Sequence, residues 1–379
     1  MAEGPVPIRI AWIFPTLDYG GAERQYLELA RAMDQRRFDP HFILLNDRHR
    51  LLDEQYGRIE GVSIHIVGRR KSLDPRRLTD LVRLLRQLRP DLVHTVLPTA
   101  NLWGLLAARW VGIRPCLGSL RGLRHSRLDR WYWIDRLALG HLADGVVVNS
   151  DTVKDNCIRM LGIKPHKIRR IYNGIRLPKI PDGDRKECLQ SLGIRCLDRP
   201  VLSVLGRLDD NKSVGDVLSA VRFLLDRNRP VTLLVGGSGL CLPALQLQAR
   251  RAGIENQVMF LGPVRDVPML FRCTDLLVCA SRSEGFPNVV LEAMASGVFV
   301  VATDISAHRE LIRHDRTGVL FEPGNPRALA EAIQEGLDHP DPCRKMALQA
   351  RAEVESRFGL DAMVQSHQDC YQQWLRDRR

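Results

Sequence analysis

The stretch Ser281-Arg-Ser-Glu-Gly-Phe-Pro-Asn-Val-Val-Leu-Glu-Ala-Met-Ala-Ser-Gly297 decides the fold. The apolar run Leu276-Leu-Val-Cys-Ala280 precedes it and is typical of a buried parallel strand. Pro287 suits the first turn of a helix, Asn288 is an alternative cap, and the apolar residues that follow predict a helix packed on the sheet up to Gly297. The stretch therefore predicts a strand, a loop and a helix start, and such loops bind phosphates and nucleotides in open α/β sheets.

Two carboxylates lie in this stretch, Glu284 at the mouth of the predicted site and Glu292 about two turns into the helix. Carboxylates are poor phosphate ligands, but each accepts two hydrogen bonds, and a vicinal diol of a sugar donates two. The pair therefore indicates a ligand that carries phosphates and sugars together. The spacing taken alone favours another interpretation, a surface helix with two solvated glutamates.

Four further motifs occur in order along nearly the whole chain: Gly20-Gly-Ala-Glu23, Ile171-Tyr-Asn-Gly-Ile175, Gly206-Arg207 followed by Lys212, and Phe260-Leu-Gly262. With them, the stretch resembles the Glu-(seven residues)-Glu signature of the retaining glycosyltransferases of family 4, which have the GT-B fold. The resemblance implies an α/β protein with two Rossmann-like domains facing each other across a cleft. It implies an N-terminal acceptor-binding domain at residues 1–178 and a C-terminal nucleotide-sugar-binding domain at 179–356. A final helix at about 357–379 is expected to pack back on the first domain.

Alternating strand and helix patterns agree with this organisation and imply parallel sheets with helices on both faces. Strands are predicted at 8–14, 39–45, 62–67, 92–95, 116–120 and 145–149, and again at 201–205, 231–235, 258–261, 276–280, 298–301 and 319–321. Pro178 to Asp184 is predicted to be a linker, because it is rich in proline, glycine and aspartate.

The composition is globular, with 379 residues of which 45% are hydrophobic and 26% charged, and the length suits two domains. No apolar run approaches the roughly 18 residues that span a bilayer, and residues 1–7 lack the features of a signal peptide. Nine cysteines without a Cys-x-x-Cys pair indicate reduced thiols and no zinc site. We therefore expect a cytoplasmic protein that can bind peripherally to the inner face of the membrane.

The net charge of +12 lies in the first half, because residues 1–178 hold 30 Lys and Arg against 18 Asp and Glu, and the remainder holds 26 of each. Two segments are especially basic, 69–89 and 121–136, and the second interleaves arginines with Trp131, Tyr132 and Trp133. Such a segment fits attraction to an anionic leaflet or a lipid diphosphate, and a solvated helix face fits equally well. Nucleic acid is a weaker alternative, because no recognised nucleic-acid motif accompanies the charge.

Two groups of residues are implied to hold the donor diphosphate. Gly20 and Gly21 open a helix, where backbone N–H groups can approach a phosphate. An isolated Gly-Gly is more often a plain turn, but in the family this loop closes over the diphosphate. By resemblance, Arg207 and Lys212 neutralise the leaving group as its charge develops. Ser213 departs from the family, in which a glycine is commoner.

The resemblance also assigns the two glutamates: Glu292 binds the ribose hydroxyls, and Glu284 contacts the transferred sugar. The nearby donor-binding residues are Phe286, Pro287, Asn288 and Val289. Neither glutamate is a nucleophile in this interpretation, because retention in the family is explained by front-face attack, with the leaving phosphate taking the acceptor's proton. The carboxylates are therefore not the pair of a retaining glycosidase.

The match is weaker in the first domain. Arg121 occupies roughly the place of a histidine that many relatives carry, and we expect it to bind donor or acceptor phosphate. His94 is expected to be a satisfied structural residue. Arg176 stands where an aspartate usually follows Asn-Gly-Ile, and Ser306-Ala307 replaces a common glycine pair. These departures bear on the donor sugar more than on the reaction class.

No metal or cofactor is implied beyond a nucleotide diphosphate sugar as co-substrate. Asp182-Gly-Asp184 spells the Asp-x-Asp motif of another glycosyltransferase fold, but it lies in the predicted linker and is interpreted as a turn. Arg207 and Lys212 would supply the electrostatic contribution of a metal.

The sequence thus predicts a metal-independent retaining hexosyltransferase. Its acceptor is a hydroxyl of a glycan or lipid-linked molecule, in the synthesis of cell-surface polysaccharide or glycolipid. Two alternatives remain open. One is a nucleotide-sugar epimerase of related fold, which would change the sugar without an acceptor. The other is a non-catalytic protein that binds a sugar nucleotide or a partner.

Overall fold

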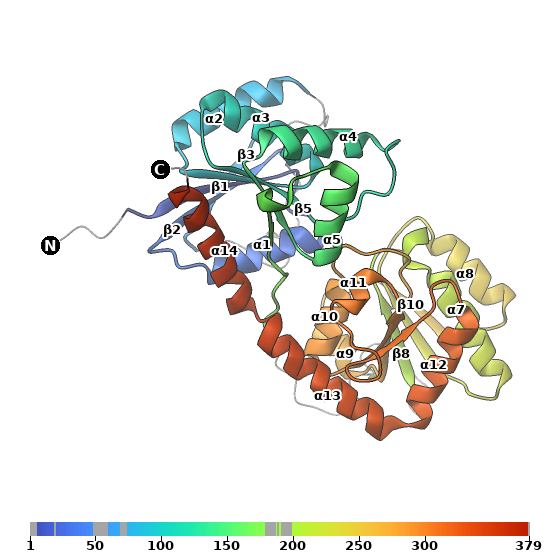
Figure 1. The fold of residues 1–379 in the computed structure, drawn as a ribbon. Coiled ribbons are helices and arrows are strands. Elements are labelled where there is room, and N and C mark those ends of the chain that lie inside the picture. Colours follow the sequence, from blue (N-terminus) through green and yellow to red (C-terminus); the bar gives the residue numbers. More distant parts are fainter. Residues whose placement is uncertain are drawn as a thin grey trace. The chain divides into compact units, whose positions relative to one another are not determined.

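The computed structural model describes residues 6–18, 20–47, 60–68, 74–178, 187, 189–190 and 199–377. The chain forms two compact units, Met1–Gly174 with Leu360–Arg379, and Ile175–Gly359. In each, helices cover both faces of a parallel sheet (Figure 1). The predicted class of two Rossmann-like α/β domains is therefore confirmed. The basic run Arg69–Lys71 and the Asp182–Asp184 motif lie outside the described residues.

The first unit contains a seven-stranded sheet in the order β3-β2-β1-β4-β5-β6-β7. Its strands are β1 (Ile8–Phe14), β2 (Phe38–Leu44), β3 (Ser63–Ile66), β4 (Leu92–Val96), β5 (Cys116–Leu120), β6 (Gly145–Val148) and β7 (Ile168–Arg170). Its helices are α1 (Gly21–Ala32), α2 (Arg76–Leu88), α3 (Pro98–Val111), α4 (Arg130–Leu137), α5 (Asp151–Asn156) and α14 (Leu360–Arg376), with short helical turns at Ala138–Leu142, Cys157–Leu161 and Pro165–Lys167.

Alternation along β1 builds the two layers of this unit, because successive side chains of a strand point to opposite faces. Trp12 and Phe14 are fully buried with residues of α1 and α14. Ala11 and Ile13 are buried on the other face, with residues of α2 and α3. The sheet is thus apolar on both sides, as a parallel sheet between helices requires.

The second unit contains a six-stranded parallel sheet in the order β10-β9-β8-β11-β12-β13. Its strands are β8 (Val201–Leu205), β9 (Thr232–Gly236), β10 (Val258–Gly262), β11 (Leu276–Cys279), β12 (Phe299–Thr303) and β13 (Val319–Phe321). Its helices are α7 (Val214–Asp226), α8 (Leu242–Arg251), α9 (Val267–Arg272), α10 (Asn288–Ala295), α11 (Ser306–Arg309), α12 (Pro326–Asp338) and α13 (Pro340–Arg357), and a short 3₁₀ turn spans Asp210–Lys212.

Both sheets follow the same winding, in which the first strand lies centrally and the fourth pairs with it on the side opposite the second. In the first unit β1 lies between β2 and β4, and in the second unit β8 lies between β9 and β11. Loops that leave two such central strands diverge and open a crevice at the carboxyl edge of the sheet. The loops after β8 and β11, together with the helix α10 that follows β11, contain most of the predicted site residues.

Two predicted elements differ from the structure. The strand β7 was not predicted, because Ile168-Arg-Arg170 is short and two of its three residues are exposed charges. The expected final helix at about 357–379 is present as α14, but it begins slightly later, at Leu360, after a break that separates it from α13, which ends at Arg357. Phe358 leaves the helical conformation with φ −126° and ψ 21°, and its carbonyl accepts a 2.9 Å hydrogen bond from the Ile175 N–H. The break lies where the chain returns from the second unit to the first.

Two general features bear on the sequence-based expectations. Within the described ranges, no helix combines the length and the apolar character needed to cross a bilayer. The described cysteines form no disulfide with one another, and most of them are buried.

Candidate active site

The loop after β8 brings Lys212 back over the edge of the sheet. Gly206 adopts φ +142°, a conformation that favours glycine, and a Cβ added there would lie 3.4 Å from Lys212 Cε. The loop then enters the 3₁₀ turn Asp210–Lys212, which Asp209 caps by accepting the Lys212 N–H at 3.2 Å. The lysine backbone is thereby held at the carboxyl end of β8.

The loop after β11 leads into α10, with Phe286 and Pro287 both buried. The helix begins at Asn288 with Pro287 as its N-cap residue, so the placement of Pro287 inside the first turn is wrong by one position. Glu292 is the fifth residue of α10, hence a little over one turn in and not two. Asn288 and Val289 are the first two residues of the helix.

The two loops meet in an ion pair between Lys212 and Glu284. The Lys212 ammonium donates a hydrogen bond to Glu284 Oε1, and the fully buried Ser281 donates to the same oxygen at 2.7 Å. Only 18% of the lysine side chain and 14% of the glutamate side chain are exposed. Burial alone would lower the pKa of Lys212, but the Glu284 carboxylate more than offsets this and raises it. The lysine is therefore kept charged in a partly dry site.

A buried hydrogen-bonded cluster supports this pair from below. Thr303 donates its hydroxyl to the Ser281 carbonyl at 2.5 Å, and His308 Nδ1 donates to the Thr303 carbonyl at 2.7 Å. The other nitrogen of His308 lies 3.4 Å from Cys279 Sγ. Burial alone would raise the pKa of the Cys279 thiol, but the adjacent imidazole lowers it, and the same contact raises the pKa of His308. Thr303, at the end of β12, thus fixes the backbone of Ser281, and the hydroxyl of Ser281 is in turn bonded to Glu284.

Two other predicted residues of this unit do not join the ion pair directly. Arg207 follows Gly206, but its side chain is 81% exposed and forms a 3.1 Å salt bridge with Asp209. Glu292 is half-buried on α10. Arg207 therefore lies in the same loop as Lys212 with its charge directed to solvent.

In the first unit, the predicted glycine loop opens α1, with Gly20 as N-cap and Gly21 as the first helical residue. The Glu23 side chain folds back over Gly20, so a Cβ on Gly20 would lie 2.0 Å from Glu23 Oε2. Burial raises the pKa of Glu23 from 4.5 to about 7, against the lowering effect of its own backbone N–H, and Asp18 adds to the rise. A side chain at position 20 would therefore displace the carboxyl of Glu23 from its place above the backbone.

Arg121 extends from the end of β5 and is held on two sides. Its guanidinium donates to the Asn173 amide oxygen at 2.9 Å and to the Tyr26 hydroxyl at 2.9 Å, and it lies 5.0 Å from the centre of the Tyr26 ring. The remaining Arg121 Nε is buried without a hydrogen-bond partner in the described part of the chain. Arg121 is therefore a restrained cation at the carboxyl edge of the first sheet.

His94 is a structural residue, as expected. It is fully buried, its Nδ1 lies 2.9 Å from the Tyr371 hydroxyl and its Nε2 lies 2.8 Å from Ser119 Oγ. Trp12 donates its indole N–H to the same Tyr371 hydroxyl at 3.0 Å, so that hydroxyl is left to donate to His94. Burial, with a contribution from Arg121, holds the pKa of His94 well below its usual range, and the imidazole is neutral.

Sequence reasoning missed the residues that link the loops. Asn211, Ser281 and Ser283 contact the opposite loop or Glu284 directly, but each belongs to a residue type common in turns. The ion pair itself joins positions 72 residues apart. No local pattern signals such contacts.

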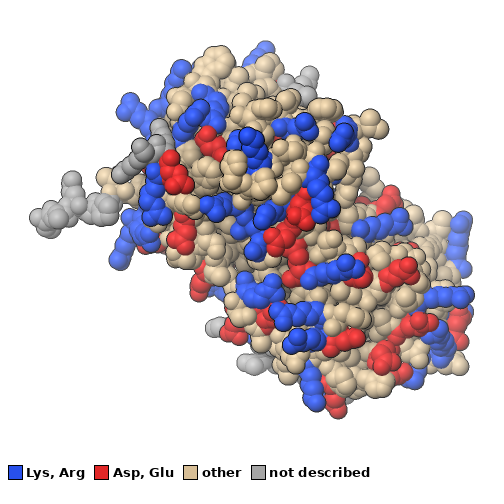
Figure 2. Space-filling model, in the orientation of Figure 1, with Lys and Arg blue, Asp and Glu red and all other residues tan. Residues whose placement is uncertain are grey.

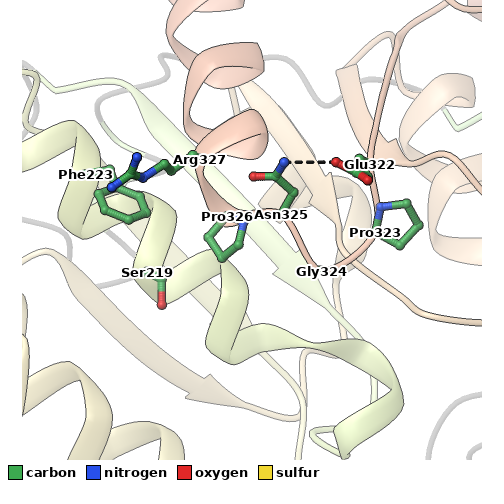
Figure 3. A pocket seen from close by; sticks show the side chains of 8 residues that line it. All are labelled: Ser219, Phe223, Glu322, Pro323, Gly324, Asn325, Pro326 and Arg327. Atoms are coloured by element: carbon green, nitrogen blue, oxygen red, sulfur yellow. Dashed lines mark hydrogen bonds between the residues drawn. The ribbon is translucent and has the colours of Figure 1, made fainter.

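The described residues include no group of three or more His, Cys, Asp or Glu side chains placed to hold a metal ion. A pocket of about 480 Å³ lies where the turn before α12 meets α7 (Figure 3). There Asn325 donates to Glu322 at 3.0 Å, and the Arg327 guanidinium lies 5.6 Å from the Phe223 ring centre. None of the predicted site residues lines this pocket, so we assign it no part in the site.

Comparison with known proteins identifies the family of both halves. The pattern described as "Glycosyltransferase Family 4" matches residues 19–178, and that described as "Glycosyl transferases group 1" matches residues 199–339. A D-inositol 3-phosphate glycosyltransferase of Streptomyces griseus is 30% identical over 76% of this chain and 68% of its own length. The UDP-Gal:alpha-D-GlcNAc-diphosphoundecaprenol alpha-1,3-galactosyltransferase of Escherichia coli is 24% identical over 93% of each chain.

Coverage differs among the relatives, since the chain spans 58% and 55% of the length of two other matched D-inositol 3-phosphate glycosyltransferases. Among solved structures, Anabaena HepE in complex with UDP-glucose has the same fold, with a TM-score of 0.84 and 24% identity over 97% of this chain and 100% of that one. Two Rossmann-like units of this kind are the GT-B architecture. The chain therefore belongs to the group 1, family 4 glycosyltransferases, a family of enzymes with the GT-B fold that use nucleotide sugars.

Proposed function

We propose that the protein transfers a hexosyl group from a nucleotide diphosphate sugar to a hydroxyl of a glycan or lipid-linked acceptor, with retention at the anomeric carbon. The observation that carries the proposal is the Lys212–Glu284 pair between the loops that follow β8 and β11. A cation and a carboxylate at this point match the two needs of such a donor, neutralisation of phosphate and hydrogen bonding to sugar hydroxyls.

The arrangement of the pair suggests how it divides this work. Glu284 Oε1 already accepts hydrogen bonds from Lys212 and Ser281, so we assign Oε2 to the hydroxyls of the transferred sugar. Lys212 carries three donors and can bind the diphosphate while it stays paired with Glu284. The exposed Arg207 is placed in the same loop and can close on the outer phosphate oxygens. Glu292 and the start of α10, from Phe286 to Val289, are assigned to the ribose and the sugar.

The proposed transfer requires neither a metal ion nor a covalent enzyme intermediate. The bond between the acceptor oxygen and the anomeric carbon forms as the bond from that carbon to the phosphate oxygen breaks. The proton of the acceptor hydroxyl passes to the departing phosphate oxygen, on the same face of the sugar. Lys212 and Arg207 stabilise the charge that develops on the diphosphate, which accounts for most of their contribution to rate.

The first unit is assigned to the acceptor and to the outer side of the donor. Arg121 is a fixed cation whose Nε has no partner in the described residues, which suits a bound phosphate. Gly20 and Gly21 present the N-terminus of α1 to the diphosphate. The Escherichia coli relative is named for a diphosphate-linked lipid acceptor, which supports an acceptor of that class.

A membrane surface is the proposed location of that acceptor, although fewer arginines are available for it than the sequence suggested. Arg124 forms a 2.6 Å salt bridge with the fully buried Asp135, and Arg121 is held inside the unit. Tyr132 is also buried. On the face shown in Figure 2, basic side chains predominate over the first unit, and both signs are mixed over the second.

The side chains that are exposed near α4 are still of the kind that binds an anionic leaflet. Leu128, Trp133 and Leu137 are 97%, 53% and 58% exposed, and the exposed Arg127 and Arg136 are their neighbours in the sequence. Apolar and basic side chains together are the combination that binds such surfaces. Sedimentation with vesicles of anionic lipid should deplete the protein from solution, and neutral vesicles should not. Equal binding to both kinds of vesicle, or to neither, would contradict this location.

The first experiment for the proposed function is thermal stabilisation by a panel of UDP-, GDP- and ADP-sugars, with a chelator present. The wild type is compared with Glu292→Ala and Glu284→Gln. One donor should raise the midpoint of the wild type, and both variants should respond much less. Release of the free nucleotide in the presence of acceptor, and the anomeric configuration of the product by NMR, then test the reaction.

Three outcomes would overturn the proposal. No shift with any donor at millimolar concentration would argue against a nucleotide-sugar site. A shift without transfer to any acceptor would favour the non-catalytic binding protein. A changed sugar without an acceptor would identify an epimerase.

A further inference from the structure

The segments Asn211–Ser213 and Arg282–Glu284 run beside one another at the carboxyl edge of the second sheet. They lie together because β8 and β11 are neighbours in the sheet, with Leu276 paired to Leu202. Each segment carries one member of the ion pair, Lys212 or Glu284. The residues around that pair are joined to each other as well.

Asn211 makes the densest of these connections. Its backbone carbonyl accepts the Arg282 N–H at 2.8 Å, and its side-chain amide donates to the Ser283 carbonyl at 2.8 Å. Ser283 returns its hydroxyl to the Asn211 side-chain oxygen at 2.8 Å. Both ends of the asparagine amide are therefore used on one residue of the opposite loop, which fixes the separation and the relative rotation of the two backbones.

A second connection lies on the other side of Lys212. Arg282 donates its Nε–H to the Ser213 hydroxyl at 3.0 Å. Asn211, before Lys212, is thus bonded to Arg282 and Ser283, the two residues that precede Glu284. Ser213, after Lys212, is bonded to Arg282. Lysine has a long and flexible side chain, so its ammonium is placed accurately only if the backbone beneath it is held. This arrangement holds both backbones at once.

We propose that Asn211, through Ser283, is a positioning residue that holds Lys212 and Glu284 in the geometry that the leaving diphosphate and the transferred sugar require. The inference rests on the proposed function, because it assigns the pair its chemical role from there. Asn211 contacts neither the donor nor the reacting atoms in this assignment. Its effect on rate comes through Lys212, and a displacement of about 1 Å in such a group can cost about 100-fold in rate.

The first test needs no donor. Lysine labelled with ¹³C reports the titration of Lys212, whose NMR signal is assigned by its loss in Lys212→Met. The pKa of Lys212 should be above the ordinary lysine value in the wild type, because Glu284 raises it. The pKa of Lys212 should fall in Asn211→Ala, because the Glu284 carboxylate is then held less closely to the ammonium and offsets less of the lowering caused by burial. An unchanged pKa in Asn211→Ala would overturn the proposal. Gly215→Ala, a change in α7 outside both loops, serves as the control.

The second test uses release of nucleotide from the sugar nucleotide that stabilises the wild type. Asn211→Ala should lower kcat by about 10- to 100-fold and change the KM for that donor by less than about 3-fold. In Lys212→Met, the further change Asn211→Ala should have no additional effect. Fully additive losses would overturn the proposal, because they would mean that Asn211 acts independently of Lys212.

Ser283→Ala removes only the returning hydroxyl and should reproduce part of the loss, and Ser283→Thr should retain most of the activity. Thermal melting of each variant separates misfolding from misplacement. If the wild type turns over no sugar nucleotide, the proposed function fails. The titration of Lys212 still decides whether Asn211 positions the pair.

Discussion

The carboxyl edges of the two sheets have the same topology and very different chemistry. Below the first edge, in the middle of β4, His94 is fully buried and neutral, and its ring is bonded to Tyr371 and Ser119. At the second edge, the Lys212–Glu284 pair is partly exposed and charged. One winding of strands thus carries a neutral network in one unit and an ion pair in the other. The side chains placed on the winding, and not the winding itself, decide what each edge can bind.

This difference assigns the two edges different tasks. The neutral hydrogen-bonded network around His94 stabilises its surroundings and itself offers little to a charged ligand. Arg121, which donates to Tyr26 beside this network, is the group of the first edge that we assign to phosphate. A partly solvated pair of opposite charges can exchange one of its contacts for a ligand group. We therefore expect changes at the second edge to act on turnover, and changes inside the first network to act on stability.

The largest expected effect comes from removing the cation of the second edge. Lys212→Met keeps the side-chain length, removes the charge and leaves Glu284 in its partly buried place without that partner. We expect kcat to fall by about 100- to 1,000-fold, comparable to the loss of one preorganised donor at a developing charge. Steady-state release of nucleotide measures this.

Lys212→Arg is the matched control and should retain more activity than Lys212→Met, because it keeps the charge. If Lys212→Met unfolds the second unit but turns over normally per folded molecule, the pair is structural. The two edges would then not differ in the way that we propose.

The next effect concerns the titratable group that the first edge buries, Glu23. The unfolded chain releases this proton near pH 4.5, whereas the native state keeps it to about pH 7. The native state therefore binds more protons between these values, and the free energy of unfolding of the first unit falls as pH rises through the window. The fall amounts to at most about 3.5 kcal/mol, from roughly 1.4 kcal/mol for each unit of pKa shift.

Urea unfolding at several pH values measures this dependence. All six tryptophans lie in Met1–Gly174 or Leu360–Arg379, so their fluorescence reports on the first unit. Glu23→Gln cannot ionise and should flatten the dependence between pH 4.5 and 7. A slope equal to that of the wild type would show that Glu23 is ionised in the native state throughout.

His94→Leu tests the first network directly. The change leaves the hydroxyls of Tyr371 and Ser119 without their histidine partner in a fully buried site. Such a loss costs about 2 kcal/mol of stability, from roughly 1–3 kcal/mol for each buried group left unsatisfied. We expect a lower urea midpoint and nearly unchanged kcat in the molecules that remain folded. A collapse of kcat with full stability would assign His94 to the chemistry and remove the contrast between the edges.

Much of the fold could be predicted from the sequence, because most strands are largely apolar runs of the length that a parallel sheet buries, with β2, β3 and β7 as the more polar exceptions. The start of the final helix could also be predicted close to its observed position, but the hydrogen bond from Ile175 to the Phe358 carbonyl could not, since the two residues lie far apart in the chain. Motifs placed Lys212 and Glu284 at the correct loops. That the two side chains bond to each other, and that Asn211 holds them, depends on which loops the strand order makes neighbours.

The smallest expected effect concerns Ser213, the departure from glycine that follows Lys212. The structure shows a left-handed residue at this position, with φ 47° and ψ 39°. A non-glycine residue in that region costs about 1 kcal/mol. Ser213→Gly should remove this cost but also lose the hydroxyl that accepts from Arg282 and gain entropy in the unfolded chain. We therefore expect a net gain in stability of at most about 1 kcal/mol.

Ser213→Ala keeps the strained backbone and loses the same hydroxyl, so it should be less stable than the wild type, and the order Gly, Ser, Ala is the specific expectation. Differential scanning calorimetry of the three proteins measures it. If alanine is as stable as serine, the contact with Arg282 contributes nothing to stability. The connection on that side of Lys212 would then be weak, and Asn211 alone would hold the charged edge in place. The second edge would in that case depend on one asparagine, whereas the first depends on a whole network.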